Sequence, residues 1–129
     1  DDVGDLPTRL PSDAGEVSVG GDVAWLAAGN EHTCAVLATG TVKCWGMGSY
    51  GVLGYGNTNF LASPEANVPV GSEVVQISAG IDHTCALLAT GTVRCWGRGT
   101  SGRLGYGSTA NVGDTLANIP ADAGDVPVW

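Results

Sequence analysis

Two short patterns hold the residues best suited to chemistry: a histidine, a cysteine two positions later, and a second cysteine on the far side of a predicted turn. Their members are His32, Cys34 and Cys44, then His83, Cys85 and Cys95. Thiolate and imidazole groups bind zinc, but structural zinc sites usually separate paired cysteines by only about two to four residues. The even cysteine count therefore favours two disulfides, Cys34–Cys44 and Cys85–Cys95, over zinc, with buried free thiols as the remaining alternative.

A glycine-rich stretch follows each pattern and formally matches the GxGxxG signature of dinucleotide sites, at Gly46–Gly51 and Gly97–Gly102. A pyrophosphate site needs the N-terminus of a helix directly after these glycines. The sequence that follows the first stretch, VLGYG at 52–56, cannot sustain a helix because glycine is so frequent in it. We therefore expect a repeated turn, and neither a nucleotide nor another cofactor.

Other residues of catalytic type lack the neighbours that catalysis requires. His32 and His83 have no nucleophile or orienting acid beside them in sequence, so we expect each to bond a neighbouring strand or blade. Trp45 and Trp96 are expected to pack in the core, with carbohydrate stacking as the alternative. An enzyme is not expected. The acidic residues of the connectors fit no calcium loop and are expected to form a solvated face. They are Asp1, Asp2, Asp5, Asp13, Glu16, Asp114, Asp122 and Asp125.

The composition excludes several classes of protein. The chain has 129 residues, a formal net charge of −8 and only 5 basic side chains, too scattered to bind nucleic acid or an anionic membrane surface. No apolar run approaches the roughly 18 residues of a spanning helix, so we expect no membrane insertion and no signal peptide here. The missing initiator Met indicates a processed or excised product. The 21 glycines predict short strands and tight turns.

Both patterns belong to a repeat with a period of 51 residues, measured from His32 to His83. The sequence AGNEHTCAVLATGTVKCWGMGSYGVLGYGN returns as AGIDHTCALLATGTVRCWGRGTSGRLGYGS, and the ends also match, since residues 1–20 resemble residues 110–129. Repeats of this length built from short strands are typical of propeller blades. We divide the chain into a closing edge segment (1–21), a first repeat (22–72), a second repeat core (73–109) and a connector with a partial blade (110–129).

Within each repeat, a sequence such as TCAVLATGTVKCW predicts a β-hairpin that turns at Ala38–Gly40, where glycine can adopt a positive φ. The register that sets Val36 opposite Val42 also sets Cys34 opposite Cys44. Directly opposed residues of a non-hydrogen-bonded pair approach to about 4.5 Å between Cα atoms, which a disulfide tolerates. Apolar runs such as CAVLA predict strands buried on both faces, as between neighbouring blades.

The order of landmarks in both repeats, G-x-x-HTCA, TG-x-V, CWG-x-G and LG-x-G, resembles the repeat of the regulator of chromosome condensation family. The resemblance covers residues 23–56 and 74–107 and implies a β-propeller, usually of about seven blades with four strands each. Family members include a nucleotide-exchange factor at chromatin, a secreted bacterial inhibitor of β-lactamases and a plant ultraviolet sensor, so the fold selects no function. The acidic charge argues against the first role. The GWRHT pattern of the light sensor is replaced here by GNEHT and GIDHT.

Two blades would leave two apolar faces uncovered. We therefore expect an all-β, non-enzymatic module for protein–protein interaction or self-assembly, in which residues 1–20 of one chain complete the blade left unfinished at 110–129 of the next. Such head-to-tail contacts close a ring or grow into a filament. The paired cysteines are similar to those of extracytoplasmic bacterial members, which implies a location outside the cytoplasm. The alternative is a fragment of a longer secreted propeller that binds a protein, including an enzyme it inhibits, or a glycan. Its contacts would be turn residues that differ between the repeats, namely Met47, Tyr50, Val52, Arg98 and Arg103.

Overall fold

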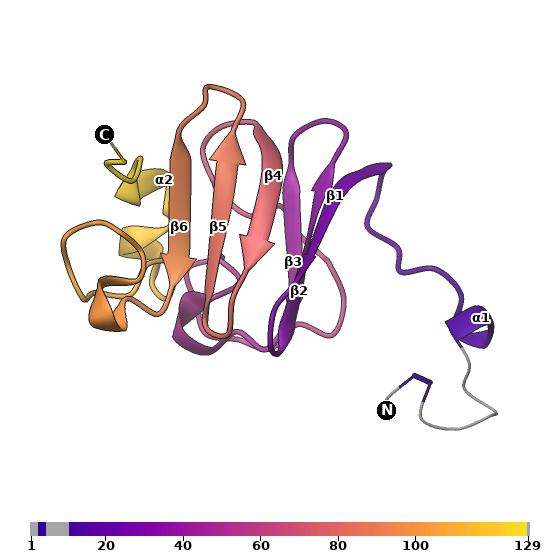
Figure 1. Ribbon diagram of the computed structural model, residues 1–129. Coiled ribbons are helices and arrows are strands. Elements are labelled where there is room, and N and C mark those ends of the chain that lie inside the picture. Colours follow the sequence, from indigo (N-terminus) through magenta and orange to yellow (C-terminus); the bar gives the residue numbers. More distant parts are fainter. Residues whose placement is uncertain (1–2, 5–10, 129) are drawn as a thin grey trace.

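The computed structural model describes residues 3–4 and 11–128, and in this part of the chain two antiparallel sheets of three strands stand side by side (Figure 1). The first sheet holds β1 (Val23–Ala28), β2 (His32–Leu37) and β3 (Val42–Gly46), and the second holds β4 (Val74–Ala79), β5 (His83–Leu88) and β6 (Val93–Gly97). Each sheet is one repeat, and the expected all-β class is confirmed. Asp1, Asp2 and Asp5 of the acidic N-terminal cluster lie outside the described residues.

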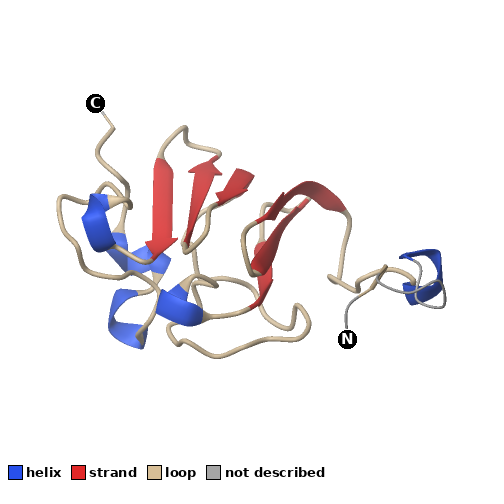
Figure 2. Ribbon diagram, turned by 60° about the horizontal axis from the view of Figure 1, so that its bottom comes forward, coloured by secondary structure: helices blue, strands red, loops and turns tan. Residues whose placement is uncertain are grey.

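Short helical turns connect and flank the sheets (Figure 2). The α-helices are α1 (Pro11–Ala14), which lies away from both sheets, and α2 (Pro120–Ala123), which lies beside β6 (Figure 1). The 3-10 turns are η1 (Ser49–Gly51), η2 (Thr100–Gly102) and η3 (Leu116–Asn118). The glycine-rich stretches therefore continue into three-residue turns and not into helices.

The hairpin register expected from the sequence is confirmed. Thr33 pairs with Trp45, Cys34 with Cys44 and Val36 with Val42, and the second repeat has the same register at positions 51 residues later. At the turn, Gly40 adopts a φ of +85°, which a side chain would strain. This register places both cysteines of a repeat on the same face of its sheet.

The two faces of each sheet differ, and the fold brings unlike faces together. We call the face that carries His32, Cys34 and Val36 the cysteine face, and the face that carries Thr33, Ala35, Leu37 and Trp45 the tryptophan face; the second repeat has the same two faces 51 residues later. The cysteine face of the first repeat packs on the tryptophan face of the second in one hydrophobic core. This core is the inter-repeat junction. The cysteine face of the second repeat remains open at one end. At the other end the tryptophan face of the first repeat is partly covered, because Val19 packs with the buried Ala35 and Leu37 in a second, smaller cluster.

The outer edge of each sheet is met by the connector that follows it. Gly46 forms an isolated bridge with Leu61, and Val68 N donates to Val42 O at 2.8 Å. The described part of the chain thus has three strands and a bridge in each blade, where the family resemblance implies four strands.

The second sheet has the same edge, since Gly97 bridges to Val112 and Val126 N donates to Val93 O at 2.7 Å. This finding corrects one expectation. Residues 110–128 do not leave the second blade unfinished for the N-terminal segment of another chain, because they meet the outer edge of β6 themselves.

Candidate functional site

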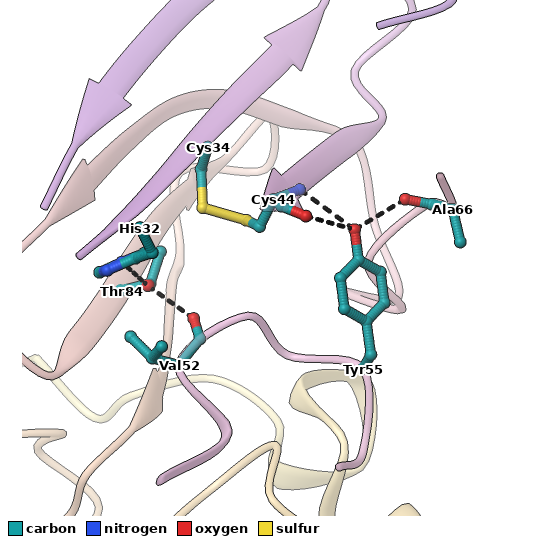
Figure 3. The surroundings of a disulfide bond; sticks show 7 residues. All are labelled: His32, Cys34, Cys44, Val52, Tyr55, Ala66 and Thr84. Atoms are coloured by element: carbon teal, nitrogen blue, oxygen red, sulfur yellow. Dashed lines mark hydrogen bonds between the residues drawn. A yellow bond between two sulfur atoms is a disulfide. The ribbon is translucent and has the colours of Figure 1, made fainter. Parts of the chain in front are cut away.

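The inter-repeat junction contains a chain of polar groups beside the first disulfide (Figure 3). The Thr84 hydroxyl donates to Val52 O at 2.9 Å, so its oxygen is left to accept from His32 Nε2, also at 2.9 Å. This arrangement places the ring proton of His32 on Nε2. Burial is the largest influence on this histidine and lowers its pKa, opposed by the negative charge of Asp82. The histidine of the first repeat therefore ties the two blades together.

The cysteine pairs lie at disulfide distance in both hairpins. The sulfur atoms of Cys34 and Cys44 are 2.05 Å apart and those of Cys85 and Cys95 are 2.08 Å apart. Cys34 and Cys44 are fully buried under the second repeat, whereas Cys85 lies on the uncovered cysteine face and is partly exposed. No group of three or more His, Cys, Asp or Glu side chains in the described part of the chain is placed to hold a metal ion.

A tyrosine that our sequence interpretation left without a role closes the outer edge of each sheet. The Tyr55 hydroxyl accepts from Cys44 N at 3.1 Å, and it lies within donating distance of Cys44 O (3.1 Å) and Ala66 O (2.8 Å) (Figure 3). Burial raises its pKa, because the phenolate is harder to solvate there. One hydroxyl thus serves the backbone groups that a fourth strand would otherwise pair.

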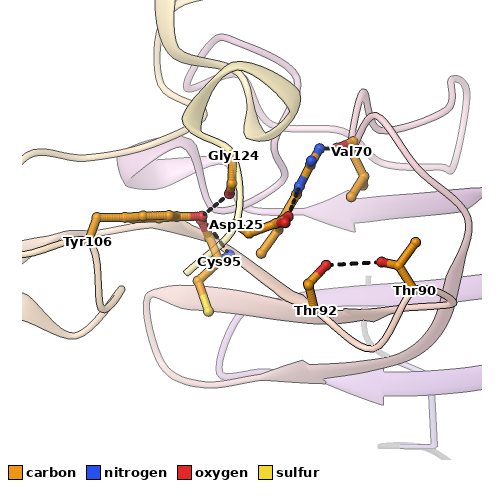
Figure 4. Close-up of polar contacts among 8 residues, drawn as sticks. Val70, Thr90, Thr92, Cys95, Tyr106, Gly124 and Asp125 are labelled. Carbon is orange, nitrogen blue, oxygen red and sulfur yellow. Dashed lines mark hydrogen bonds and ion pairs between the residues drawn. The ribbon is translucent and has the colours of Figure 1, made fainter. Parts of the chain in front are cut away.

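Tyr106 does the same in the second repeat, bonding Cys95 N, Cys95 O and Gly124 O at 3.1 Å each (Figure 4). Its pKa is also raised, chiefly by burial. Arg94 fixes the nearby connectors, since it donates to Val70 O and pairs with Asp125 at 2.9 Å. The recurrence of Tyr55 and Tyr106 at the repeat offset was the sequence signal for this role.

Four of the five variable turn residues are at least partly exposed. Met47 and Tyr50 are exposed, and the Arg98 guanidinium lies 4.7 Å from the centre of the Tyr50 ring while pairing with Asp82 at 3.3 Å. Arg103 is exposed and donates to Thr100 O at 2.9 Å. Val52 was wrongly included among the surface contacts, because it is only 3% exposed and packs in the junction core.

The two outer faces, the cysteine face of the second repeat and the partly covered tryptophan face of the first, contain the remaining expected site residues. His83 and Cys85 lie on the cysteine face of the second repeat, and Nδ1 of His83 is buried without a hydrogen-bond partner among the described residues. Trp45 lies half-buried on the tryptophan face of the first repeat, whereas its counterpart Trp96 is fully buried in the junction. The fold therefore brings His32 and Trp96 to one junction and leaves His83 and Trp45 at opposite ends.

No helix among the described residues has the length and apolar character needed to cross a membrane.

Comparison with known proteins gives consistent matches. Residues 26–52 and 74–103 match the regulator of chromosome condensation (RCC1) repeat. The ultraviolet-B receptor UVR8 of Arabidopsis thaliana is 34% identical over 109 residues, which cover 84% of this chain and 25% of the receptor. The E3 ubiquitin-protein ligase HERC2 of Homo sapiens is 41% identical over 83 residues, which cover 60% of this chain and 2% of the ligase. The chain thus spans a quarter or less of these relatives.

Solved structures share the fold. The crystal structure of human WBSCR16 matches with a TM-score of 0.59 and 28% identity, over 64% of this chain and 21% of that one. The crystal structure of Kap60 bound to yeast RCC1 (Prp20) matches with a TM-score of 0.52 and 26% identity, over 81% of this chain and 25% of that one. Both repeats are therefore supported as RCC1 repeats, and their two sheets as blades of an RCC1-like β-propeller.

Proposed function

We propose that this chain is a non-enzymatic module for protein–protein interaction that assembles with further copies of itself. The observation that carries this proposal is the pair of exposed blade surfaces at the two ends of the described sheets: the cysteine face of the second repeat, and the part of the first repeat's tryptophan face that Val19 leaves exposed. The equivalent face of the other repeat is buried in the inter-repeat junction. Covering the exposed face at each end therefore stabilises the fold in the same way. The proposal keeps the division into segments 1–21, 22–72, 73–109 and 110–129. HERC2 is a ligase, but the match covers 2% of it, so we carry over no ligase activity.

The proposed location is outside the cytoplasm, as in the disulfide-containing bacterial members of the family. Both cysteine pairs support it, because structural disulfides persist in oxidising compartments. Titration of free thiols in the unfolded but unreduced protein, isolated from its natural source, tests this location. We expect no reactive thiol, and four reactive thiols per chain would contradict the proposal.

Native mass measured by light scattering at several concentrations tests the self-assembly. We expect a multiple of the 12.9 kDa chain mass if a ring closes, and a mass that keeps growing with concentration if a filament forms. The measurement needs an ionic strength of about 0.15 M, where charges further apart than about 8 Å are largely screened, because each copy carries a formal charge of −8. A mass of 12.9 kDa at every concentration would refute self-assembly.

A second candidate is that the chain is part of a longer secreted propeller that binds a protein or glycan through its variable turns. The stacking of Arg98 on Tyr50 favours it, because this contact joins the variable turns of both blades into one surface. Among the solved relatives, yeast RCC1 is bound to Kap60. Glycan-array and pull-down binding by the protein tests this candidate. Binding that survives the double change Tyr50→Ala and Arg103→Ala would exclude this surface.

A further inference from the structure

We propose that the tryptophan face of the first repeat docks on the cysteine face of the second repeat of another copy, so that the contact between copies repeats the inter-repeat junction. This inference rests on the self-assembly part of the proposed function and names the surfaces and residues that carry it. The occupant of each face is therefore a second copy of this chain. Positions that are equivalent by the repeat differ in burial between the two repeats, and this difference supports the contact.

The tryptophan face of the first repeat is covered only in part within the single chain, because Val19 packs on the buried Ala35 and Leu37 while other apolar side chains of this face stay exposed. Val74 and Ile77 of the second repeat are 2% and 4% exposed, because they pack in the junction core. Their equivalents in the first repeat, Val23 and Leu26, are 47% and 61% exposed. The strand pairings set Leu26 opposite Ala35 and Ile77 opposite Ala86, so the two sets project from the same face of their sheets. The first repeat thus exposes, at Val23 and Leu26, part of the apolar surface that the second repeat buries in the junction.

The cysteine face of the second repeat provides the space to receive this surface. A hollow of about 310 Å³ lies on this repeat, lined by Cys85, Leu87 and Val93 and bounded by Trp25, whose indole N–H donates to Ile77 O at 2.9 Å. In the first repeat the equivalent positions are at most 1% exposed, because the second repeat covers them: Cys34, Val36 and Val42. Docking of Leu26 and Val23 from another copy would cover the corresponding surface.

The polar groups of the junction also recur. His32, Thr84 and Val52 correspond to His83, Thr33 and Arg103. His83 and Arg103 lie on the receiving copy. Thr33 lies on the tryptophan face that the second copy would bring. In the docked pair, Thr33 of the second copy donates to Arg103 O and accepts from His83 Nε2. This contact would give Nε2 of His83 the partner that Nε2 of His32 has in the junction, while the buried Nδ1 of His83 is not served by it.

The contact needs no exchange of strands. Val126 of the receiving copy keeps its bond to Val93 O at the outer edge of β6. The corresponding segment of the incoming copy, residues 12–19 (SDAGEVSV), is similar to residues 121–128 (ADAGDVPV), but this edge is already met by the receiving copy's own segment. Face-to-face docking is therefore decided by the exposed apolar side chains, and substitution of those side chains tests it.

Two substitutions test the two faces one at a time. Leu26→Glu places a charge on the tryptophan face, where the side chain is exposed, and Leu87→Glu places one in the hollow of the cysteine face. The matched control is Leu116→Glu, because Leu116 is 78% exposed and lies in η3, away from both faces. Circular dichroism and thermal unfolding of every variant establish that it folds, and Leu26→Glu alone keeps the test valid if Leu87→Glu does not fold.

We expect the control to keep the native mass of the unmodified protein, and each face variant alone to fall to 12.9 kDa. An equimolar mixture of the two face variants should give a species of twice that mass and nothing larger, because each variant retains one intact face. If the protein assembles but Leu26→Glu leaves its mass unchanged, the proposed contact is wrong while self-assembly stands. If the unmodified protein is monomeric, self-assembly itself fails, and the contact with it.

Discussion

Replacing Tyr55 with phenylalanine tests the role of the tyrosine hydroxyl at the outer edge of the first sheet. The ring stays, so packing is retained, but Cys44 N loses its acceptor and Ala66 O loses its donor. An unsatisfied buried N–H costs about 1–3 kcal/mol and an ordinary lost hydrogen bond about 1 kcal/mol. We therefore expect Tyr55→Phe to lower the free energy of unfolding by about 2–3 kcal/mol, or the melting temperature by roughly 6–10 °C.

Urea and thermal unfolding followed by circular dichroism measure this change. Tyr106→Phe should cost a similar amount, because Tyr106 bonds the equivalent backbone groups. The matched control is Tyr50→Phe, since Tyr50 is exposed and its hydroxyl has no hydrogen-bond partner among the described residues. It should change stability by less than about 0.5 kcal/mol. If Tyr55→Phe and Tyr106→Phe are as mild as this control, the hydroxyls do not hold the sheet edges.

Three further predictions concern pH, glycine and the disulfides. The pKa of His32 is lowered in the fold, so the unfolded chain binds a proton at this residue more readily than the folded chain. The free energy of unfolding should therefore be highest above the ordinary pKa of 6.5 and fall as the pH drops below it. Urea unfolding between about pH 7.5 and pH 5 should show this fall, and the fall should be smaller in His32→Gln. Gly51 and Gly102 both have positive φ, but a Cβ at Gly51 would clash with the backbone of 113–114 and one at Gly102 would meet nothing. Thermal unfolding should therefore show a loss of about 1–2 kcal/mol for Gly102→Ala and clearly more for Gly51→Ala, and equal losses would contradict the close contact. Limited reduction and thiol labelling of the chain should open Cys85–Cys95 before the buried Cys34–Cys44, and the reverse order would refute the burial difference.

The sequence predicted the hairpins well because their signals are local. The turn needs a positive φ at Gly40, and the spacing of the cysteines around it leaves one register that sets them opposite each other. The 51-residue period then carried the same register to the second repeat. Contacts between residues close in sequence are limited by turn geometry, so a single sequence determines them strongly.

The sequence did not predict how the connectors meet the sheets. The bond from Tyr55 to Cys44 depends on the path of a glycine-rich segment, and no periodicity describes that path. Val52 failed for the same reason, because its turn folds inward and not toward solvent. The sequence also did not predict which face of the first repeat packs on which face of the second. The alternation of side chains along a strand assigns them to two faces, but it does not say which face meets the neighbouring repeat.

The position of the disulfides has a consequence for how the chain reaches its oxidised state. Four cysteines allow several alternative pairings, but each pair here joins residues 10 apart within a single hairpin. Hairpins form in about 1–10 μs, far faster than thiols oxidise, so the correct partners meet before any bond is made. Oxidation of one repeat thus requires nothing from the other, and an added or deleted repeat would not scramble the pairing. We therefore expect the repeat, and not the whole chain, to be the unit of oxidative folding.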